Sequence, residues 1–458
     1  MSSSIFRSLA NDYKTWSALS TYLTSDAGGS LRVYDRSTPE NPFALVRYVK
    51  GKSDLSKPHV RAFRSVVWDT LENRPVSVTP FKSEDGESLP TTEGDSTEGY
   101  TVERFVDGVM IGGFWDRYNN QWRIHTRSAL DANTRYYSQN TTFQKMFFEA
   151  WNGNWDILDK SCSYTWVLQH PGNRIVVPVT KPTVSLVHKV KINEDSTTTY
   201  DKDSSNFLRV LSPTPTWTDV RARLADWNTQ FKHAAQGLVV RDAEGKRWKV
   251  RTAEYNRVRQ LRGNTARRDY LWLTMWRSGE LRNYLALFPE ERGPSNSLIE
   301  QWKQITSEVF HFYTDVFKAR TLAKTQIPPK YRPFVYGIHS LFMESLKPAG
   351  KTVVWKTALE FMNKRDVAQM LFVLNWDFKQ AAKMAGVREI PLEPAVNLGT
   401  DVQGTDVQEP EPRRRIVAIR REYGEDEPVY EGEEDDDLPP LVPMAEAIVQ
   451  VQTPAGGE

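Results

Sequence analysis

The spacing of the hydrophobic residues changes near residue 265, and this change constrains the fold more than any other feature of the sequence. Before it, short β-branched and aromatic runs are bounded by Gly, Pro, Asn and Asp, which predicts strands joined by turns. After it, apolar residues recur three or four positions apart, which predicts helices. Aromatic residues then become scarce beyond about residue 395. We therefore expect three regions, 1–262, 263–395 and 396–458.

The first region is predicted to be α+β with antiparallel sheets. One stretch, Thr142–Trp151, places Phe143, Met146, Phe147 and Ala150 at helical spacing, so a packed helix is expected there. The expected strands are Val66–Trp68, Val76–Val78, Val109–Phe114, Trp122–His125, Ser163–Leu168, Arg174–Val179, Val184–Val190, Gly237–Arg241 and Trp248–Val250.

The second region is predicted to be an all-helical C-terminal domain. Its breaks fall at Pro328–Pro329 and Pro348–Gly350. The third region, 396–458, contains the acidic run Glu433–Asp437 and too few apolar residues to offset the entropy of ordering, so a disordered acidic tail is expected. The expected helices are Tyr270–Trp276, Ser297–Thr321, Phe334–Leu346 and Thr352–Met362.

Composition excludes several classes of protein. With 39% hydrophobic residues, including 15 Trp, 18 Tyr and 20 Phe among 458, the chain is too apolar to be wholly disordered. No apolar run is long enough for a membrane helix, and the N-terminal residues lack the apolar core of a signal peptide. The only cysteine, Cys162, excludes an intrachain disulfide. We expect a soluble protein of a reducing compartment, cytoplasmic or nuclear, with no membrane partner.

The formal net charge of +2 combines two opposite regions. Asp401–Glu458 carries −11, so residues 1–400 carry +13. A basic body predicts a polyanionic partner, RNA or another polyanion, and the tail predicts a basic protein partner. The alternative for the body is a surface of scattered cations with no patch. Charge alone does not distinguish RNA, DNA and acidic lipid.

Four segments occur in an informative order. They are YTVERFVDGVMIGGFW (Tyr100–Trp115), SYTWVLQHPGNRIVVP (Ser163–Pro178), AQGLVVRD (Ala235–Asp242) and RWKVRTAEYNRVRQLRGN (Arg247–Asn264). Together they resemble the nucleotidyltransferase domain of ATP-dependent RNA ligases, specifically the phage-type RNA ligase 1 group and its relatives in large DNA viruses. The family's corresponding motifs are K-x-D-G, F-E-x-x-x-P-x-N-R-I-V, E-G-x-V-V and K-x-K.

The resemblance spans about residues 60–380 and implies an ATP-grasp-like ligase fold, with ATP and Mg²⁺ as cofactors if the pocket is functional. Adenylation needs a deprotonated amine as nucleophile and a divalent metal held by carboxylates. At the position of the lysine nucleophile this chain has Phe105, which cannot form a phosphoramidate. The glutamate of the second motif corresponds to Val167, with a register shift of one residue as the alternative, and that of the third to Gln236. No catalytic residue and no metal site is therefore assigned.

The residues suited to binding are retained. Lys249 and Arg251, two apart on an expected strand, should share a face and could meet one phosphate. The alternative for this pair is two solvent-exposed charges. The expected nucleotide- or phosphate-binding residues are Asp107, Gly108, Arg127, Asn173, Arg174, Gln236, Lys249 and Arg251. The expected RNA-binding residues, in the densest basic stretch, are Arg257, Arg259, Arg262, Arg267 and Arg268.

Three functions fit this pattern. The first is a degenerate ligase homologue, a pseudoenzyme that binds nucleotide or RNA without adenylating itself. The second is an active RNA ligase or nucleotidyltransferase that uses another nucleophile, Lys82 being the candidate, or that joins pre-adenylated ends. The third is a structural or interaction protein that reuses the fold.

Overall fold

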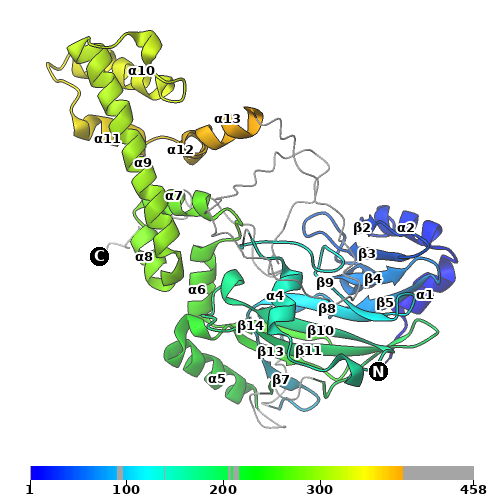
Figure 1. Cartoon of the computed structure of the whole chain (residues 1–458). Helices are drawn as coiled ribbons and strands as arrows, with labels where there is room; N and C mark the ends of the chain where they lie inside the picture. Colours follow the sequence, from blue (N-terminus) through cyan, green and yellow to red (C-terminus); the bar gives the residue numbers. More distant parts are fainter. Residues whose placement is uncertain (1, 90–95, 139, 205–207, 210–215, 385–458) are drawn as a thin grey trace, which may run out of the picture. The chain divides into compact units, whose positions relative to one another are not determined.

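A computed structural model of the chain describes residues 2–89, 96–138, 140–204, 208–209 and 216–384 (Figure 1). The described residues form two compact units, 2–266 and 267–384. The first unit contains antiparallel sheets with helices and the second is helical, which confirms the expected α+β class and the helical C-terminal half. The expected acidic tail, 396–458, lies outside the described residues. In the described ranges, no helix combines the length and the apolar character needed to cross a bilayer.

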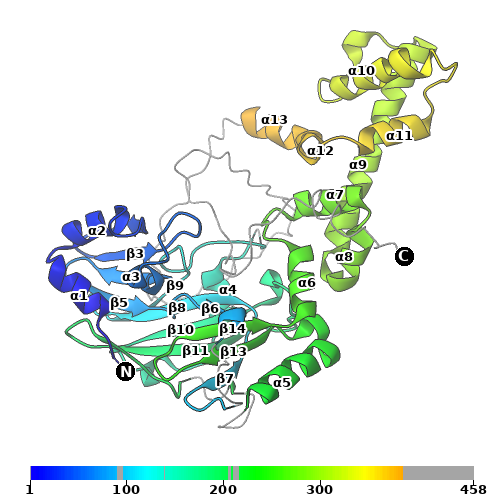
Figure 2. The ribbon, with the colours of Figure 1, turned by 180° about the vertical axis from the view of Figure 1, so that it is seen from behind.

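Three sheets build the first unit (Figures 1 and 2). Sheet I is the largest, and its strand order is β1 (Ser2–Ser3), β12 (Thr198–Tyr200), β11 (Thr183–Ile192), β10 (Cys162–Gln169), β8 (Val109–Asp116) and β9 (Gln121–His125). Sheet II is β2 (Arg32–Asp35), β3 (Phe43–Arg47), β4 (Val66–Asp69) and β5 (Arg74–Val78). Sheet III is β6 (Glu84–Asp85), β14 (Arg247–Arg251), β13 (Gly237–Arg241) and β7 (Thr101–Arg104). All described pairings are antiparallel except that of β6 with β14.

Sheet I is buried on both faces. One face packs under α4 (Phe143–Ala150), where Trp166 and Ile111 contact the apolar side of the helix. All four residues expected to pack from this helix are buried, so that prediction is confirmed. Because side chains alternate along a strand, Ser163 and Val167 of β10 point to the opposite face. That face meets sheet II at Ser163 and sheet III near Val167.

Two adjacent glycines let large rings lie on β8. A Cβ on Gly112 would come within 2.1 Å of the His125 imidazole, and one on Gly113 within 2.4 Å of the Trp166 indole. The two rings lie on opposite faces of the sheet, as the alternation of the strand requires. The Gly-Gly pair of VMIGGFW therefore serves packing on both faces.

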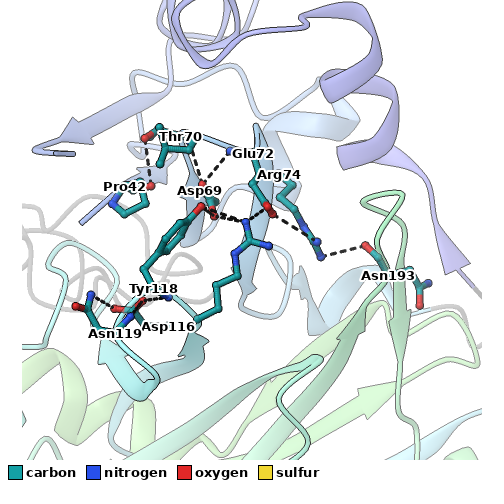
Figure 3. A network of polar contacts seen from close by, with 11 residues as sticks. Pro42, Asp69, Thr70, Glu72, Arg74, Asp116, Tyr118, Asn119 and Asn193 are labelled. Carbon is teal, nitrogen blue, oxygen red and sulfur yellow. Dashed lines mark hydrogen bonds and ion pairs between the residues drawn. The ribbon is translucent and has the colours of Figure 1, made fainter. Parts of the chain in front are cut away.

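A polar network connects the turn after β4 of sheet II with the turn after β8 of sheet I (Figure 3). Asp69, at the end of β4, accepts hydrogen bonds from the backbone N–H groups of Leu71 and Glu72 and from the Tyr118 hydroxyl at 2.9 Å. Asp116, at the end of β8, accepts from the backbone N–H groups of Tyr118 and Asn119. Each turn is thus stabilised by an aspartate that accepts hydrogen bonds from its backbone, and the Tyr118 hydroxyl links the two turns.

Helices surround the sheets of the first unit. Helices α1 (Ile5–Asp12), α2 (Trp16–Thr24) and α3 (Pro58–Ala62) share a buried cluster with sheet II, in which Phe6, Leu19 and Trp68 are fully buried or nearly so. Helix α5 (Trp217–Gln230) packs on sheet III through Trp217 and Val220. Helix α6 (Ala253–Arg262) follows β14 directly and is capped by Thr252, whose hydroxyl accepts from the Tyr255 N–H.

The second unit is organised around α9 (Arg292–Tyr313), a long helix whose Trp302 and Tyr313 are buried. Four helices contact it: α7 (Arg268–Ser278), α10 (Arg332–Leu341), α11 (Trp355–Asn363) and α12 (Val367–Leu374). Helices α8 (Leu281–Leu287) and α13 (Trp376–Met384) complete the described part. Every helix expected from spacing in this region is present, with boundaries shifted by a few residues.

One expected strand is absent. Residues 174–179 form no strand, although their composition is β-branched. The N–H groups of Val176 and Val177 donate to the Asp107 carboxylate, and the Arg174 guanidinium donates to the Val176 carbonyl. These side-chain contacts occupy the backbone groups that a ladder would use, so the prediction for Arg174–Val179 was wrong.

Candidate functional site

A pocket lies between sheets I and III, and we call it the sheet I–III pocket. Its walls come from β7, β13 and β14 on one side and from β8, β10 and β11 on the other. Strand β7 pairs with β13, and the Phe105 N–H continues that ladder to the Gly237 carbonyl at 2.9 Å. The empty space, open mouth included, is about 700 Å³. Segments 100–115 and 235–251 therefore line a common pocket.

Phe105 lies at the pocket wall between two cations. The Lys249 Nζ is 5.2 Å and the Arg251 Cζ 5.1 Å from the centre of its ring. Both distances fall in the range of cation–π contacts. The side chain at the position where the resemblance expects a lysine thus contacts Lys249 and Arg251, and an aromatic ring offers no amine to react.

Asp107 is buried and connects three segments. Its Oδ2 accepts from the backbone N–H groups of Val176 at 3.0 Å and Val177 at 2.8 Å, and its Oδ1 accepts from the Tyr255 hydroxyl at 2.7 Å. Burial raises the pKa of the carboxyl, opposed by these three hydrogen bonds and by the nearby charge of Arg259. Asp107, which the sequence predicts to bind nucleotide, thus holds the backbone of the second motif and the start of α6 in place.

Two glycines allow the backbones to approach at the pocket. A Cβ on Gly108 would lie 2.3 Å from the Leu168 carbonyl oxygen. Gly237 has φ of +144° and a Cβ there would lie 2.0 Å from the Val250 carbonyl oxygen. Strand packing is thus a sufficient reason for the glycines of D-G and Q-G, and contact of Gly108 with a ligand stays a prediction.

The two other altered positions also line the pocket. Val167 is buried against Val187 and Leu208, whereas its neighbour Trp166 packs on the opposite face under α4. Val167 therefore faces the pocket and Trp166 does not. Gln236 is 4% exposed, and its Oε1 has no hydrogen-bond partner among the described residues.

Buried arginines surround these positions. Arg241 pairs with Glu103 at 3.0 Å and donates to the Val187 carbonyl at 3.2 Å. Val187 lies where the register of β10 and β11 shifts, so a β-bulge frees its carbonyl for this contact. Arg247 donates to the Phe81 carbonyl at 3.0 Å, and Arg64 contacts the Met110 sulfur.

Neighbouring positive charges lower the pKa of two groups beside the pocket, Arg247 and His188. Burial together with the like charges of Arg241 and Arg64 lowers the pKa of Arg247 to about 9. Burial and the charges of Arg241 and Arg247 lower the pKa of His188 well below its usual range. Both shifts have the same sign, because burial disfavours the charged form of each group and the neighbouring guanidiniums add like-charge repulsion.

Lys82, the alternative nucleophile, is not among the residues that line this pocket. Its Nζ donates to the Ser83 carbonyl at 3.2 Å, and its backbone N–H to the Arg61 carbonyl. Among the described residues, the lysine that lines the sheet I–III pocket is Lys249, and its Nζ contacts the Phe105 ring.

A second pocket shares Ile175 and Arg259 with the first, and we call it the Arg–Tyr pocket. It contains two of the expected residues, Arg127 and Asn173. The Arg127 guanidinium lies 4.7 Å from the centre of the Tyr48 ring, and the Asn173 Oδ1 accepts from the Tyr137 N–H at 3.3 Å. The lining side chains that carry charge or rings are Arg47, Arg127, Arg135, Arg259, Tyr136, Tyr137 and Phe143.

The structure thus divides the expected nucleotide-binding set. Asp107, Gly108, Gln236 and Lys249 line the sheet I–III pocket. Arg251 is not among the lining residues, and its guanidinium contacts the Phe105 ring. Arg174 lines neither pocket, since its guanidinium folds back onto the Val176 carbonyl.

The expected RNA-binding arginines have different surroundings. Arg259 and Arg262 are buried, and donate to the carbonyls of Gly263 and Arg174 respectively. Arg257 is exposed and pairs with Glu254. Arg267 pairs with Asp269, and Arg268 with Glu291, in the second unit. Contact of these five with RNA stays a prediction.

Sequence reasoning missed several lining residues, among them Arg64, Glu103, Arg241 and Tyr255. The sequence did contain a signal for Arg241. It lies two residues after Val239 and so shares its face of β13, just as Arg247 shares the face of Lys249 on β14. Extending the two-residue period of β14 by one step in each direction finds Arg247, and the paired strand then supplies Arg241. Arg64 comes from a distant segment and had no local signal.

The chain has distant structural similarity to solved ligase structures. No family model and no curated protein matches the chain. Among solved structures, form 2 of an archaeal ATP-dependent RNA ligase is similar over 66% of this chain and 82% of that chain, with 13% identity and a TM-score of 0.39. Form 1 of an archaeal ATP-dependent RNA ligase is similar over 81% of this chain and 98% of that chain, with 11% identity and a TM-score of 0.35.

Proposed function

We propose that the sheet I–III pocket binds the phosphate of a nucleotide, free or at an RNA end, and that the protein forms no covalent adenylate. The observation that carries the proposal is Phe105: it occupies the nucleophile's position and lies between Lys249 and Arg251, in a pocket lined by all four of the ligase-like segments. Cationic side chains suited to phosphate are retained there, whereas the amine and both glutamates of the family motifs are replaced.

Support for this proposal over an active ligase comes from Lys82. A nucleophile must lie within reach of the α-phosphorus, and Lys82 lines neither pocket. The proposal is favoured over a purely structural role by the buried cations of the pocket, because a structural interface would be more stable with apolar residues in their place.

The experiment is incubation with α-labelled ATP and Mg²⁺, followed by denaturing electrophoresis. We expect no labelled protein band and, in a parallel equilibrium assay, tighter binding of 5′-phosphorylated than of 5′-hydroxyl single-stranded RNA. The affinity should fall steeply with salt, since phosphate contacts release counterions. A labelled band that disappears in Lys82→Ala would establish the active-ligase alternative. Equal, weak binding of both RNAs would establish the structural one.

A further inference from the structure

The helical unit has a strongly basic segment of its own, between the end of α9 and the start of α11 (Figure 1). Residues 318–356 contain eight Lys and Arg residues against one acidic residue, Glu344. This segment lies outside the four ligase-like segments and does not include the arginines expected to bind RNA. Exposed charge of one sign attracts polyanions. Six of the eight cations are exposed, and none of the six forms an ion pair with a described residue: Lys318, Arg320, Lys324, Lys347, Lys351 and Lys356.

Aromatic rings lie among these cations. The His339 imidazole stacks on the Phe317 ring, with ring centres 3.8 Å apart and planes at 13°. Phe342 lies 6.2 Å from the same imidazole, and Tyr336, which is 39% exposed, meets the Phe317 ring edge-on at 6.4 Å. The Lys324 Nζ is 5.5 Å from the centre of the Phe317 ring. We call these residues, together with Lys347, the Phe317–His339 cluster.

Two lysines from separate segments lie near the histidine of this cluster. Lys324 precedes α10, and Lys347 follows the segment Phe342–Leu346 that continues α10. Burial is the main cause that lowers the pKa of His339, and the charges of Lys324 and Lys347 lower it further, which places both ammonium groups close to the ring. Exposed rings beside cations are the arrangement with which proteins hold unpaired bases and their phosphates.

The backbone at the cluster is unusual as well. Helix α9 continues into a π-helical turn, η7 (Thr314–Ala319), and α10 continues into another, η9 (Phe342–Leu346). Such turns are rare and occur frequently at functional sites. Each of them contributes one ring beside His339, Phe317 from η7 and Phe342 from η9. The rare backbone, the rings and the unpaired lysines thus occur at one place.

We infer that the Phe317–His339 cluster is a binding site for single-stranded nucleic acid, in which an unpaired base lies against the Tyr336 ring and neighbouring phosphates contact Lys324 and Lys347. Single strands fit the site better than a duplex, because base pairing and stacking hide the faces of the bases. A partner held by charge alone, such as an acidic protein segment, would leave the rings without a role. The inference does not depend on the sheet I–III pocket, because all residues of the cluster belong to the second unit.

The experiment is a fluorescence-anisotropy titration of the full chain with 5′-hydroxyl oligouridylate and oligothymidylate of about 12 nucleotides, and with a duplex of equal length, over a salt series. We expect single strands to bind at least about fivefold more tightly than the duplex, with affinity that falls as salt rises. The 5′-hydroxyl end lacks the terminal phosphate that the sheet I–III pocket is proposed to bind. Equal or tighter binding of the duplex overturns the inference. Single-strand binding that does not change on 5′-phosphorylation supports this inference and refutes the proposed function alone.

A pair of charge reversals tests the lysines. Lys324→Glu combined with Lys347→Glu should weaken oligouridylate binding at least about tenfold, because both phosphate contacts become repulsive. The matched control is Lys303→Glu combined with Lys364→Glu, two other exposed lysines of the same unit, which gives the same net charge and should stay within about twofold of the unmodified chain. Equal losses by the two pairs would mean that net charge alone drives binding, and the inference would fail.

A ring substitution tests stacking separately from charge. Tyr336→Ala should weaken oligouridylate binding about tenfold, whereas Tyr336→Phe, which keeps the ring, should bind like the unmodified chain. Unchanged affinity of Tyr336→Ala overturns the inference, as does displacement of the oligouridylate by poly-L-glutamate at equal charge, which would identify a site for acidic protein. If Tyr336→Ala fails to fold, Tyr336→Leu replaces it and must lose at least about fivefold.

Discussion

Sheet I meets two smaller sheets on the same face, and the two interfaces differ in how their buried polar groups are satisfied. Against sheet II, the Ser77 hydroxyl lies 2.8 Å from His125 Nε2 and 3.0 Å from the Ser163 hydroxyl, while His125 Nδ1 lies 2.9 Å from the Thr126 carbonyl. Against sheet III, one side-chain atom each of Arg241 (Nη1), Arg247 (Nε) and Gln236 (Oε1) has no hydrogen-bond partner among the described residues.

The comparison shows that burial alone does not identify a binding site. Both interfaces bury polar residues at the ends of the same strands. At the sheet I–II interface the central cluster of serine and histidine side chains is hydrogen-bonded within the protein, so this cluster needs no ligand to be stable. At the sheet I–III interface, buried guanidinium and amide atoms beside the pocket have no partner among the described residues, so their hydrogen bonds are left for a ligand or water.

The largest expected effect tests the closed interface. Gly112→Val should lower the free energy of unfolding by about 4 kcal/mol or more, because its Cβ would lie 2.1 Å from His125 in a packed interior. Urea denaturation followed by tryptophan fluorescence measures this. Gly293→Ala, in α9 with open space around its Cβ, is the control and should be neutral or stabilising. A loss below about 1 kcal/mol for Gly112→Val would show that His125 and its neighbours can move to accommodate the larger side chain.

Arg123, which is largely but not fully buried, and the buried Arg247 allow a comparison between a cation that has carboxylate partners and one whose neighbours repel it. Arg123, at the sheet I–II side, donates to both oxygens of Asp131 at 2.9 and 2.8 Å and lies 3.5 Å from the buried Asp116. Arg123→Met should therefore cost about 3 kcal/mol of folding free energy, since it leaves a buried carboxylate without its cation.

Arg247→Met should behave in the opposite way. The pKa of Arg247 is lowered to about 9, so its charged form is already disfavoured, and removing it should change folding free energy by less than about 1 kcal/mol. Pyrophosphate affinity should fall about 30-fold. Denaturation and calorimetry on both variants check the pair. Equal destabilisation by the two substitutions would remove the distinction between the interfaces.

His125 makes stability depend on pH in a defined direction. Burial lowers its pKa to about 4 in the folded state, against about 6.5 when unfolded. The stability it contributes is therefore complete above pH 6.5 and is lost as the pH falls through 4, amounting to about 2 kcal/mol between pH 7 and pH 5. Urea titrations of the unmodified chain and of His125→Gln at both pH values measure this difference. The variant should lose about 2 kcal/mol less than the unmodified chain over that interval; parallel losses would contradict the assignment.

The sequence predicted most strands that form the two interfaces, but it did not predict how the buried polar groups of each interface are satisfied. Strands at Val109–Phe114, Ser163–Leu168 and Gly237–Arg241 follow from β-branched and aromatic runs, which local sterics favour. The strand expected at Arg174–Val179 failed because Asp107, about 70 positions away, binds its N–H groups. A contact of that separation leaves no trace in local composition.

The candidate site was predicted in part for a similar reason. Alternation along β14 placed Lys249 and Arg251 on one face, and both contact Phe105. Asp107 and Arg174 were assigned to ligand because they are polar residues in motif positions, yet each binds backbone. Whether a polar side chain meets protein or ligand depends on which backbone groups the fold leaves unpaired, and that requires the tertiary structure.

The smallest expected effect distinguishes the interfaces most directly, because one histidine reports on each. The pKa of His188 is lowered by burial and by the charges of Arg241 and Arg247, whereas burial is the main cause for His125. A bound polyphosphate cancels charge only near the first. NMR titration with pyrophosphate should therefore raise the pKa of His188 and leave that of His125 unchanged. Arg247→Met should raise the pKa of His188 without any ligand, since it removes one of the two repelling charges. If pyrophosphate instead shifts both histidines equally, the anion is not seated between sheets I and III, and the difference between the two interfaces concerns packing alone.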